Sequence, residues 1–355
     1  MVAMHPWIFP RQRIHRDERM KLFTTGRATL LRRWSLPLSL IAAIAAPAHG
    51  ADKLRFGLNW YPQAEHCGWF QAQAAGLYKK AGLEVELIGG SPDRNVPLLV
   101  AAGELDLGMG SSFTTLNMAA RGIPARTIAA FLQKDPQTLV AHADQGVKTL
   151  ADLKGRPIMV AKFSQAEFWA FLKQKHGFSD SQLRPYAYSP APFLADAKAV
   201  QQGYITEDAQ LLGKALPKPP VSILLADYGY ENYASTIFAM DRYIAANEKA
   251  VAAFVEATRA GWQQCIDGDY APALNAVVAA DPKHDIALFH FKMKQMKELA
   301  MVKHGDALQS GAGAMSDARW KRFFDTMSAA GIYPATLDYK AAYTLRFSNA
   351  KAAWQ

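Results

Sequence analysis

The sequence predicts an α/β fold made of two doubly wound lobes. Its 355 residues are enough for two domains, each with its own core. Short apolar segments alternate with helical patterns, which is typical of parallel sheets covered by helices. From residue 248 on, the pattern is entirely helical. We therefore expect an N-terminal extension at 1–50, a first lobe at 51–140, a second lobe at 141–238, and a return to the first lobe with C-terminal helices at 239–355.

The first lobe is predicted from the segments between residues 54 and 132. Strands are expected at 54–60, 83–90, 105–111 and 125–132, and in the second of these, "LEVELIGG", apolar residues alternate with period two. Helices are expected at 68–82, 95–103 and 113–122. Gly82 and Gly103 end the first two helices, because a glycine readily adopts the left-handed conformation there.

The second lobe is predicted from the pattern that follows. Residues 139–142 leave the first sheet, and 147–177 read as a helix, a strand and a second helix. A strand at 183–189, a helix around Ala195–Gln202 and a strand at 222–227 complete this lobe. The chain is expected to cross between the lobes near Leu139–Ala143 and near Asp227–Ala239. The proline-rich "LPKPP" at 216–220 reads as a surface loop.

The positive charge is concentrated in the first fifty residues. The chain carries a net charge of +9, and eight basic residues against Asp17 and Glu18 assign +6 of it to residues 1–50. The remainder is too weakly basic for a nucleic-acid-binding protein, which needs a concentrated basic face. With half of its residues hydrophobic and a fifth charged, the chain is globular and not disordered.

Residues 20–50 have the order of a secretion signal. A basic region ends in Arg32 and Arg33, the apolar run "LPLSLIAAIAA" follows, and small residues Ala48 and Gly50 precede a cleavage site before Ala51. The apolar run is shorter than the roughly 20 residues that span a bilayer. We expect a cleaved signal and a soluble periplasmic protein; an uncleaved anchor is the alternative. Translation starts at Met1 or at Met20.

The chain contains two cysteines, Cys67 and Cys265. Neither lies at the cleavage site, so no lipid anchor is expected. A disulfide between them is possible in an oxidising compartment, and two free thiols are equally consistent with the sequence. Two cysteines so far apart do not form a metal site.

Candidate ligand-binding residues follow the predicted strands, where open α/β sheets bind their ligands. These segments combine aromatic rings with short polar groups, as in sites for planar ligands. The residues are Asn59, Trp60 and His66 after the first strand, Ser111 and Ser112 after the third, Phe163, Glu167 and Trp169 in the second lobe, and Tyr204 and Glu207 before its last strand.

Each of these residues also has a structural interpretation. Trp60 could close the first-lobe core, and Ser111 and Ser112 are good helix N-caps. His66 could cap a helix. Phe168 and Trp169 are adjacent on a helix and cannot both face one side, so one of them is expected in the core. Glu207 and Asp208 could form a solvated acidic turn.

Catalytic signatures are missing from the sequence. It contains no GxSxG elbow, no HExxH and no phosphate-binding GxxxxGK[ST] motif, and its histidines lack the spacing of metal ligands. We expect neither enzymatic activity nor a cofactor or metal ion.

Several segments resemble SsuA/NMT1-type periplasmic solute-binding proteins of ABC importers. They are "LNWYPQAEHCGWFQAQAAGLYKKAGLEVELIGG", "LVAAGELDLGMGS", "TLADLKGRPIMV", "AEFWAFLKQKHGF", "QQGYITED" and "ILLADYGY", in this order. The chain is most similar to the branch that binds pyrimidine precursors of thiamine. The resemblance implies a type II periplasmic binding fold, two lobes joined by a two-crossing hinge, and a monomer that serves a membrane permease and its ATPase.

The resemblance also implies roles for the candidate residues. Asn59 and Trp60 would hold the ligand ring, and His66, Ser111 and Ser112 would line the first-lobe wall. Glu167, Tyr204 and Glu207 would contact the ligand from the second lobe, although Asp208 and Ala209 depart from the family pattern after Glu207. Asp227 would lie at a hinge crossing.

Two alternative functions remain within the resemblance. A sulfonate, taurine or nitrate receptor would need basic residues, yet only Lys162 is placed for this while Glu167, Glu207 and Asp227 add negative charge. A related fungal enzyme makes the thiamine pyrimidine from its own histidine and pyridoxal phosphate. The lysine and histidine that this chemistry needs fall on Gly110 and Thr114 here, and the segment "NYASTIFAM" lacks the cysteines of its iron site. We therefore expect a receptor and not a synthase.

Overall fold

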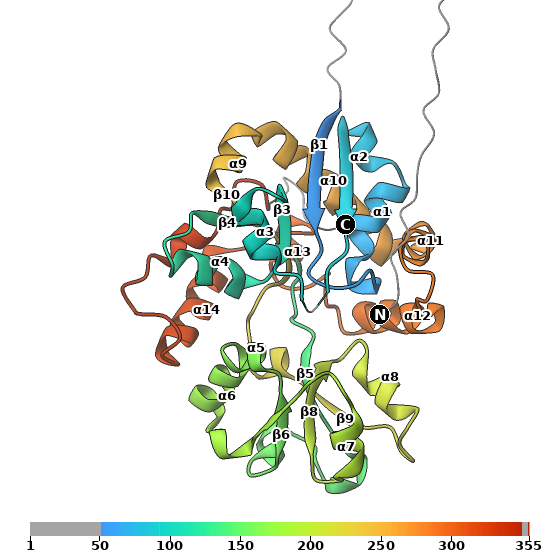
Figure 1. The fold of residues 1–355 in the computed structure, drawn as a ribbon, viewed down its shortest axis with the longest axis vertical. Helices are drawn as coiled ribbons and strands as arrows, with labels where there is room; N and C mark the ends of the chain where they lie inside the picture. The colour runs from blue at the N-terminus through green and yellow to red at the C-terminus, as the bar shows by residue number, and fades with distance from the viewer. Residues whose placement is uncertain (1–50, 92, 350–353, 355) are drawn as a thin grey trace, which may run out of the picture. The chain divides into compact units, whose positions relative to one another are not determined.

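The computed structural model describes residues 51–91, 93–349 and 354. The secretion signal expected in 1–50 lies outside the described residues. The described chain forms two lobes, and each is built around a five-stranded sheet (Figure 1). In this part of the chain, no helix is both long and apolar enough to cross a membrane.

The first sheet has the strand order β2–β1–β3–β10–β4. Strand β1 pairs in parallel with β2 and β3, while β10 runs antiparallel to β3 and β4. The reversed strand is the one with which the chain returns from the second lobe. The bounds are β1 (Asp52–Gly57), β2 (Leu83–Ile88), β3 (Leu107–Gly110), β4 (Ala125–Leu132) and β10 (Ala234–Met240).

The second sheet repeats this arrangement with the order β7–β6–β8–β5–β9. Here β5, with which the chain enters the lobe, runs antiparallel to β8 and β9. The predicted pair of doubly wound lobes is confirmed, but each sheet contains one antiparallel strand. The bounds are β5 (Gln137–Ala141), β6 (Ile158–Val160), β7 (Leu183–Pro185), β8 (Val200–Tyr204) and β9 (Val221–Leu224).

Helices follow most of the strands, and the last third of the chain is almost entirely helical. The first lobe holds α1 (Cys67–Ala74), α2 (Leu77–Lys80), α3 (Val96–Ala102) and α4 (Ser112–Ala119). The second lobe holds α5 (Lys162–Gln165), α6 (Phe168–His176), α7 (Ala191–Ala195) and α8 (Asp208–Gly213). The remainder forms α9 (Asp241–Ala246), α10 (Glu248–Asp267), α11 (Ala271–Ala280), α12 (Ile286–Glu298), α13 (Asp306–Ser310) and α14 (Asp317–Ala329).

The helix predicted around Ala195–Gln202 is wrong. A short helix ends at Ala195, and residues 200–204 form β8, the middle strand of the second sheet. Its consecutive glutamines suggested a helix, but both are buried, and Gln202 Oε1 accepts a hydrogen bond from the Ala161 N–H at 2.6 Å. Pairing with strands on both sides overrides the local preference of these residues.

The chain passes between the sheets at residues 133–136 and again at 225–233. The first passage lies before the expected position near Leu139–Ala143, because residues 137–141 already belong to the second sheet. The second passage begins with the short helix η5 (Leu225–Tyr228), which contains Asp227. Asp227 therefore lies in a connection between the lobes, as the sequence predicted.

Helices α1 and α10 pack unusually closely in the first-lobe core. A Cβ added to Gly68 would lie 2.1 Å from the Trp262 ring, and one added to Gly261 would lie 2.1 Å from the Gly68 carbonyl oxygen. Beside this contact, Cys67 and Cys265 form a disulfide with their Cα atoms 6.2 Å apart. The bridge joins the first residue of α1 to α10.

We expect removal of this bridge to destabilise the protein. A Cys67→Ala/Cys265→Ala variant should lose about 2–5 kcal/mol of unfolding free energy, because the unfolded chain is no longer cross-linked. Urea unfolding with and without reductant measures this. Reductant should lower the midpoint of the unmodified protein and leave that of the variant unchanged; equal midpoints for both proteins would contradict the assignment.

Candidate functional site

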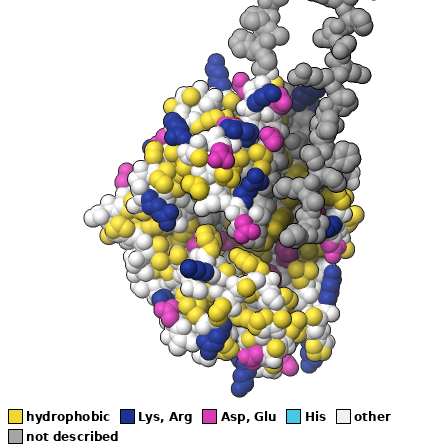
Figure 2. Space-filling view, viewed as in Figure 1, with side chains coloured by type: hydrophobic (Ala, Val, Ile, Leu, Met, Phe, Trp, Pro, Cys, Tyr) yellow, Lys and Arg dark blue, Asp and Glu magenta, His cyan; other side chains and the backbone are white. Residues whose placement is uncertain are grey.

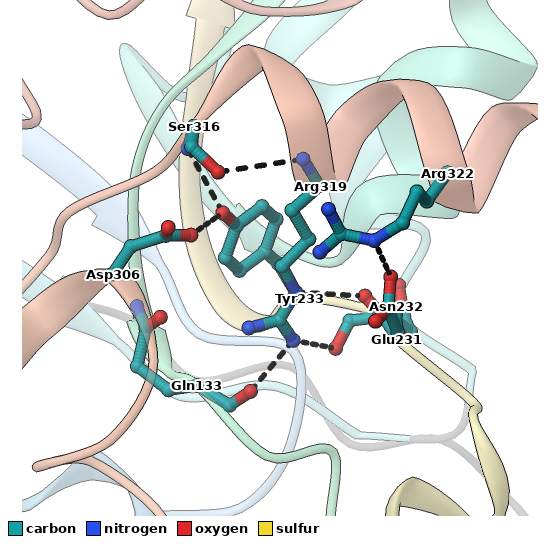
Figure 3. A network of polar contacts seen from close by, with 8 residues as sticks. All are labelled: Gln133, Glu231, Asn232, Tyr233, Asp306, Ser316, Arg319 and Arg322. Atoms are coloured by element: carbon teal, nitrogen blue, oxygen red, sulfur yellow. Dashed lines mark hydrogen bonds and ion pairs between the residues drawn. The ribbon is translucent and has the colours of Figure 1, made fainter.

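Arg319 of α14 holds the two connections between the lobes together (Figure 3). Its Nη2 donates to the carbonyl of Gln133 in the first connection at 2.6 Å and to that of Asn232 in the second at 3.0 Å. Its Nε donates to the Glu231 carbonyl at 3.0 Å, and the guanidinium lies 4.0 Å from the centre of the Tyr233 ring. One buried cation thus fixes both passages of the chain.

Side-chain contacts add to this link between the connections. Asn232 Nδ2 donates to the buried carboxyl of Asp135 at 2.6 Å, and Lys134 lies 3.6 Å from Asp227 in an ion pair. Behind the connections, one continuous apolar cluster contains Phe113 of the first lobe and Phe171 of the second. The hinge region is therefore well packed, and it places the two lobes against each other.

Aromatic side chains from both lobes meet beside the loop that follows β1. The ring of Trp60 is half-buried, and its centre lies 5.6 Å from Tyr61 and 5.8 Å from Tyr188 of the second lobe. Tyr188 is 55% exposed, contacts Tyr186, and has a positive φ of 58°. A bulky residue in this backbone conformation carries strain, which is often retained at ligand sites.

Glu167 lies among tyrosines that come from several segments. Burial raises its pKa well above the usual value, and the nearby charge of Asp135 raises it further. Burial also raises the pKa of Tyr230 and Tyr333, and nearby negative charge raises it further, from Asp135 and then Glu167 at Tyr230 and from Glu167 at Tyr333. Among the described residues, none forms a hydrogen bond with the Glu167 carboxyl group. The residue is partly exposed, and the described part of the protein supplies no partner for its carboxyl group.

Tyr204 ends β8 and is 37% exposed, while the surrounding protein raises its pKa well above the usual value. Its backbone N–H donates to Asp208 at 2.6 Å, and burial raises the pKa of Asp208 to about 6.

Three of the predicted ligand residues have structural roles. Trp169 is buried in the second-lobe core and donates to Asp180 at 2.8 Å, and Phe168 is buried as well, so the expectation that only one of the two is core is wrong. Ser112 is buried and accepts a hydrogen bond from the Tyr233 N–H at 3.0 Å. Burial lowers the pKa of His66 to about 3, which keeps this fully buried ring neutral.

The other predicted residues are accessible or paired. Asn59 and Phe163 are exposed, and Ser111 begins α4, where its N–H donates to Thr114 at 3.1 Å. Asp227 is exposed in the second connection. Glu207 lies 2.5 Å from Lys292, so its carboxylate already has a cationic partner.

Sequence reasoning missed several residues of this region. Asp135, Tyr188 and Tyr333 interact with Glu167 or Trp60 from segments without a recognised motif. Tyr230 ends the quoted segment "ILLADYGY" but was not selected. Lys292 lies in the C-terminal helical part that was assigned a packing role. Tyr188 lies in the strand predicted at 183–189, where the aromatic "YAYS" was an available signal.

Charged groups are mixed over the accessible surface. On the face drawn in Figure 2, acidic and basic side chains alternate and form no large patch of one sign. The described ranges also contain no group of three or more histidine, cysteine, aspartate and glutamate side chains that could hold a metal ion. The chemical features of the site are therefore aromatic rings and carboxyl groups.

We expect Glu167→Gln to stabilise the empty protein at neutral and alkaline pH. The raised pKa means that the ionised carboxylate destabilises the fold; this cost is absent below the unfolded pKa near 4.3 and is complete above the folded pKa. The melting temperature should rise by about 2–4 °C at pH 8 and show no gain at pH 4. Glu104→Gln, at an exposed carboxyl group, is the matched control. A lower melting temperature at pH 8 would show that Glu167 has a stabilising partner.

Comparisons with known proteins agree on the family. Residues 63–269, more than half of the chain, match the family described as NMT1/THI5 like. The 4-amino-5-hydroxymethyl-2-methylpyrimidine phosphate synthase THI11 of Saccharomyces cerevisiae is 31% identical over 108 residues, 30% of this chain and 32% of that enzyme. The riboflavin-binding protein RibY of Chloroflexus aurantiacus is 24% identical over 321 residues, 86% of this chain and 90% of RibY.

Similarity in structure extends over most of the described chain. The periplasmic aliphatic sulphonate binding protein SsuA of Escherichia coli superposes with a TM-score of 0.59 at 14% identity, covering 82% of this chain and 92% of SsuA. At this identity the likeness shows the fold, which is that of periplasmic binding proteins. The matches with the thiamine-related relatives span 32% to 65% of their own length. By its sequence match and its fold, the chain belongs to the NMT1/THI5-like family.

Proposed function

We propose that this chain is an exported solute-binding protein that captures a small planar nitrogen heterocycle by closing its two lobes. The observation that carries the proposal is the unsatisfied carboxyl group of Glu167, which lies among tyrosines near the aromatic contact between Trp60 and Tyr188. A pyrimidine of the thiamine-precursor type matches both features.

The Glu167 carboxyl group suits an aminopyrimidine in either protonation state. An ionised carboxylate accepts hydrogen bonds from an exocyclic amine, whereas the neutral acid donates to a ring nitrogen and accepts from the amine. The raised pKa of Glu167 favours the neutral acid. A satisfied hydrogen bond here would also remove the cost of leaving the group unpaired in the empty protein.

The aromatic rings supply the apolar part of the binding energy. Trp60 belongs to the first lobe and Tyr188 to the second, so a ring in contact with both is held fully only when the lobes are together. Ligand binding would then shift the population towards the closed form. The relatives are consistent with this class of ligand, since RibY is named for riboflavin and the yeast enzyme for a pyrimidine.

The cellular role follows from the fold and the predicted leader. Export to the periplasm, cleavage of the signal, and delivery to an ABC permease with its ATPase are proposed by analogy with SsuA. We also propose that the protein acts as a monomer. Neighbouring genes for a permease and an ATPase would support this role.

A sulfonate or nitrate ligand is the weaker alternative. An anion requires an uncompensated cation or free N–H groups. The cation nearest to Glu207 is Lys292, and its ammonium group is already bonded to two carboxylates. Lys162 is exposed, and the carboxyl groups of Glu167 and Asp135 would repel an anion.

The proposal also leaves out the synthase activity named for the yeast relatives. The position of its lysine corresponds to Gly110, where an added Cβ would lie 2.6 Å from Thr114 Oγ1. We expect no absorbance band of a Schiff base after incubation with pyridoxal phosphate. A band that appears, disappears on borohydride reduction of the imine, and does not form in a variant lacking the reactive lysine would restore an enzymatic function.

Calorimetry with 4-amino-5-hydroxymethyl-2-methylpyrimidine and with riboflavin tests the proposed function. We expect one of these compounds to bind, and Trp60→Ala to weaken binding about 10- to 100-fold through lost stacking while the melting temperature of the empty protein stays nearly constant. Glu167→Gln should weaken binding less than Glu167→Ala, because the amide keeps a donor and an acceptor. Glu104→Gln is the control.

Native mass spectrometry of the purified protein covers ligands outside this pair. A retained heterocycle of another kind would keep the mechanism and change the ligand. A retained sulfonate or nitrate would replace the proposed ligand class, and a large loss of stability in Trp60→Ala would show that Trp60 is a core residue.

A further inference from the structure

Lys292 connects the two lobes through a buried ammonium group. Its side chain is 1% exposed and projects from α12, which also buries Phe289 and Met293. The Nζ atom donates to Gln63 at 3.0 Å and to Glu65 at 3.3 Å, both in the first lobe, and to Glu207 of the second lobe at 2.5 Å. One cation is thus shared by a carboxylate of the first lobe and a carboxylate of the second.

A second hydrogen bond crosses the same boundary. Thr206 of the second lobe donates its hydroxyl to Glu65 at 2.5 Å, and the neighbouring Ile205 packs against the apolar core of the first lobe. Nearby, Lys214, directly after α8, lies 3.6 Å from Asp285 at the start of α12. The turn before α8 is therefore docked on η1 (Ala64–His66) and α12.

The charged groups of this cluster differ in how much they depend on contact between the two lobes. Burial alone would lower the pKa of Lys292 and raise that of Glu65. The attraction of Glu65 and Glu207 together outweighs burial for Lys292, and Lys292 together with the hydrogen bond from Thr206 outweighs it for Glu65. If the lobes separate, Lys292 and Glu65 remain together in the first lobe and satisfy each other. Glu207, whose side chain is 30% exposed, returns to water. The contact can therefore break and re-form without stranding a buried charge.

We propose that Glu65, Thr206, Glu207 and Lys292 form an interlobe latch that holds part of the ligand-free protein in the closed form and so raises ligand affinity without contacting the ligand. The inference rests on the proposed function in one respect, namely that the lobes separate and close. The apparent affinity then depends on the fraction of closed protein, because it falls in proportion when the binding-competent closed state is less populated.

Spin-label distances in the ligand-free full-length protein test the latch. Labels at Glu104→Cys in the first lobe and Lys198→Cys in the second report lobe separation, since both positions are exposed and the native cysteines are joined. Glu207→Gln and Thr206→Val should each shift the distance distribution towards longer values. Lys294→Met is the matched control, because it lies on the same helix and pairs within that helix with Glu298. Unchanged distributions in both latch variants would refute the proposal.

Binding measurements separate the latch from a direct ligand contact. Loss of the latch should weaken the binding of all ligands by the same factor, about tenfold. Loss of a direct contact would instead change the order of affinities among related compounds. A change in ranking with Glu207→Gln would overturn the latch. If no ligand binds the unmodified protein, the proposed function fails, and the distance shift in the empty protein still decides whether the latch exists.

Discussion

Arg319 sets the relative position of the two connections, and the geometry of the site depends on that position. The chain in residues 51–349 passes between the sheets twice, and this buried cation bonds to carbonyl groups of both passages. Trp60 and Tyr188 belong to different sheets, so their contact reflects how the passages lie. Backbone carbonyls hold the guanidinium here, which makes the arrangement independent of the identity of the neighbouring side chains.

Two ionisable groups near the lobe boundary differ in whether the protein supplies them with partners. Lys292 has all of its bonds supplied by the protein, and this cluster contributes to structure. Glu167 lacks a partner among the described side chains and weakens the fold in which it lies. Proteins retain such destabilising groups where a ligand completes them. The contrast is the physical reason to assign the ligand to Glu167 and not to Glu207, which the sequence favoured equally.

The sequence was sufficient for the alternation of strands and helices, for the two lobes, and for Trp60, Glu167 and Tyr204 as residues near their boundary. These follow from local periodicity and from the rule that ligands bind beyond strand ends. Strand β8 was not predicted, because pairing with strands on both sides, and not the preference of its own residues, makes it extended. Trp169 and His66 are buried, because tertiary packing decides whether such a side chain turns inward. Lys292 was not predicted, since its partners Glu65 and Glu207 lie far away in the chain.

The disulfide between Cys67 and Cys265 encloses a ring of polypeptide that contains the entire second lobe. A protease that cuts one exposed loop of that lobe, such as the one at 216–220, would leave both fragments covalently attached. Nicked and intact molecules would then migrate together on an electrophoresis gel run without reductant. The second lobe can thus be cut in its backbone and still be retained by the molecule.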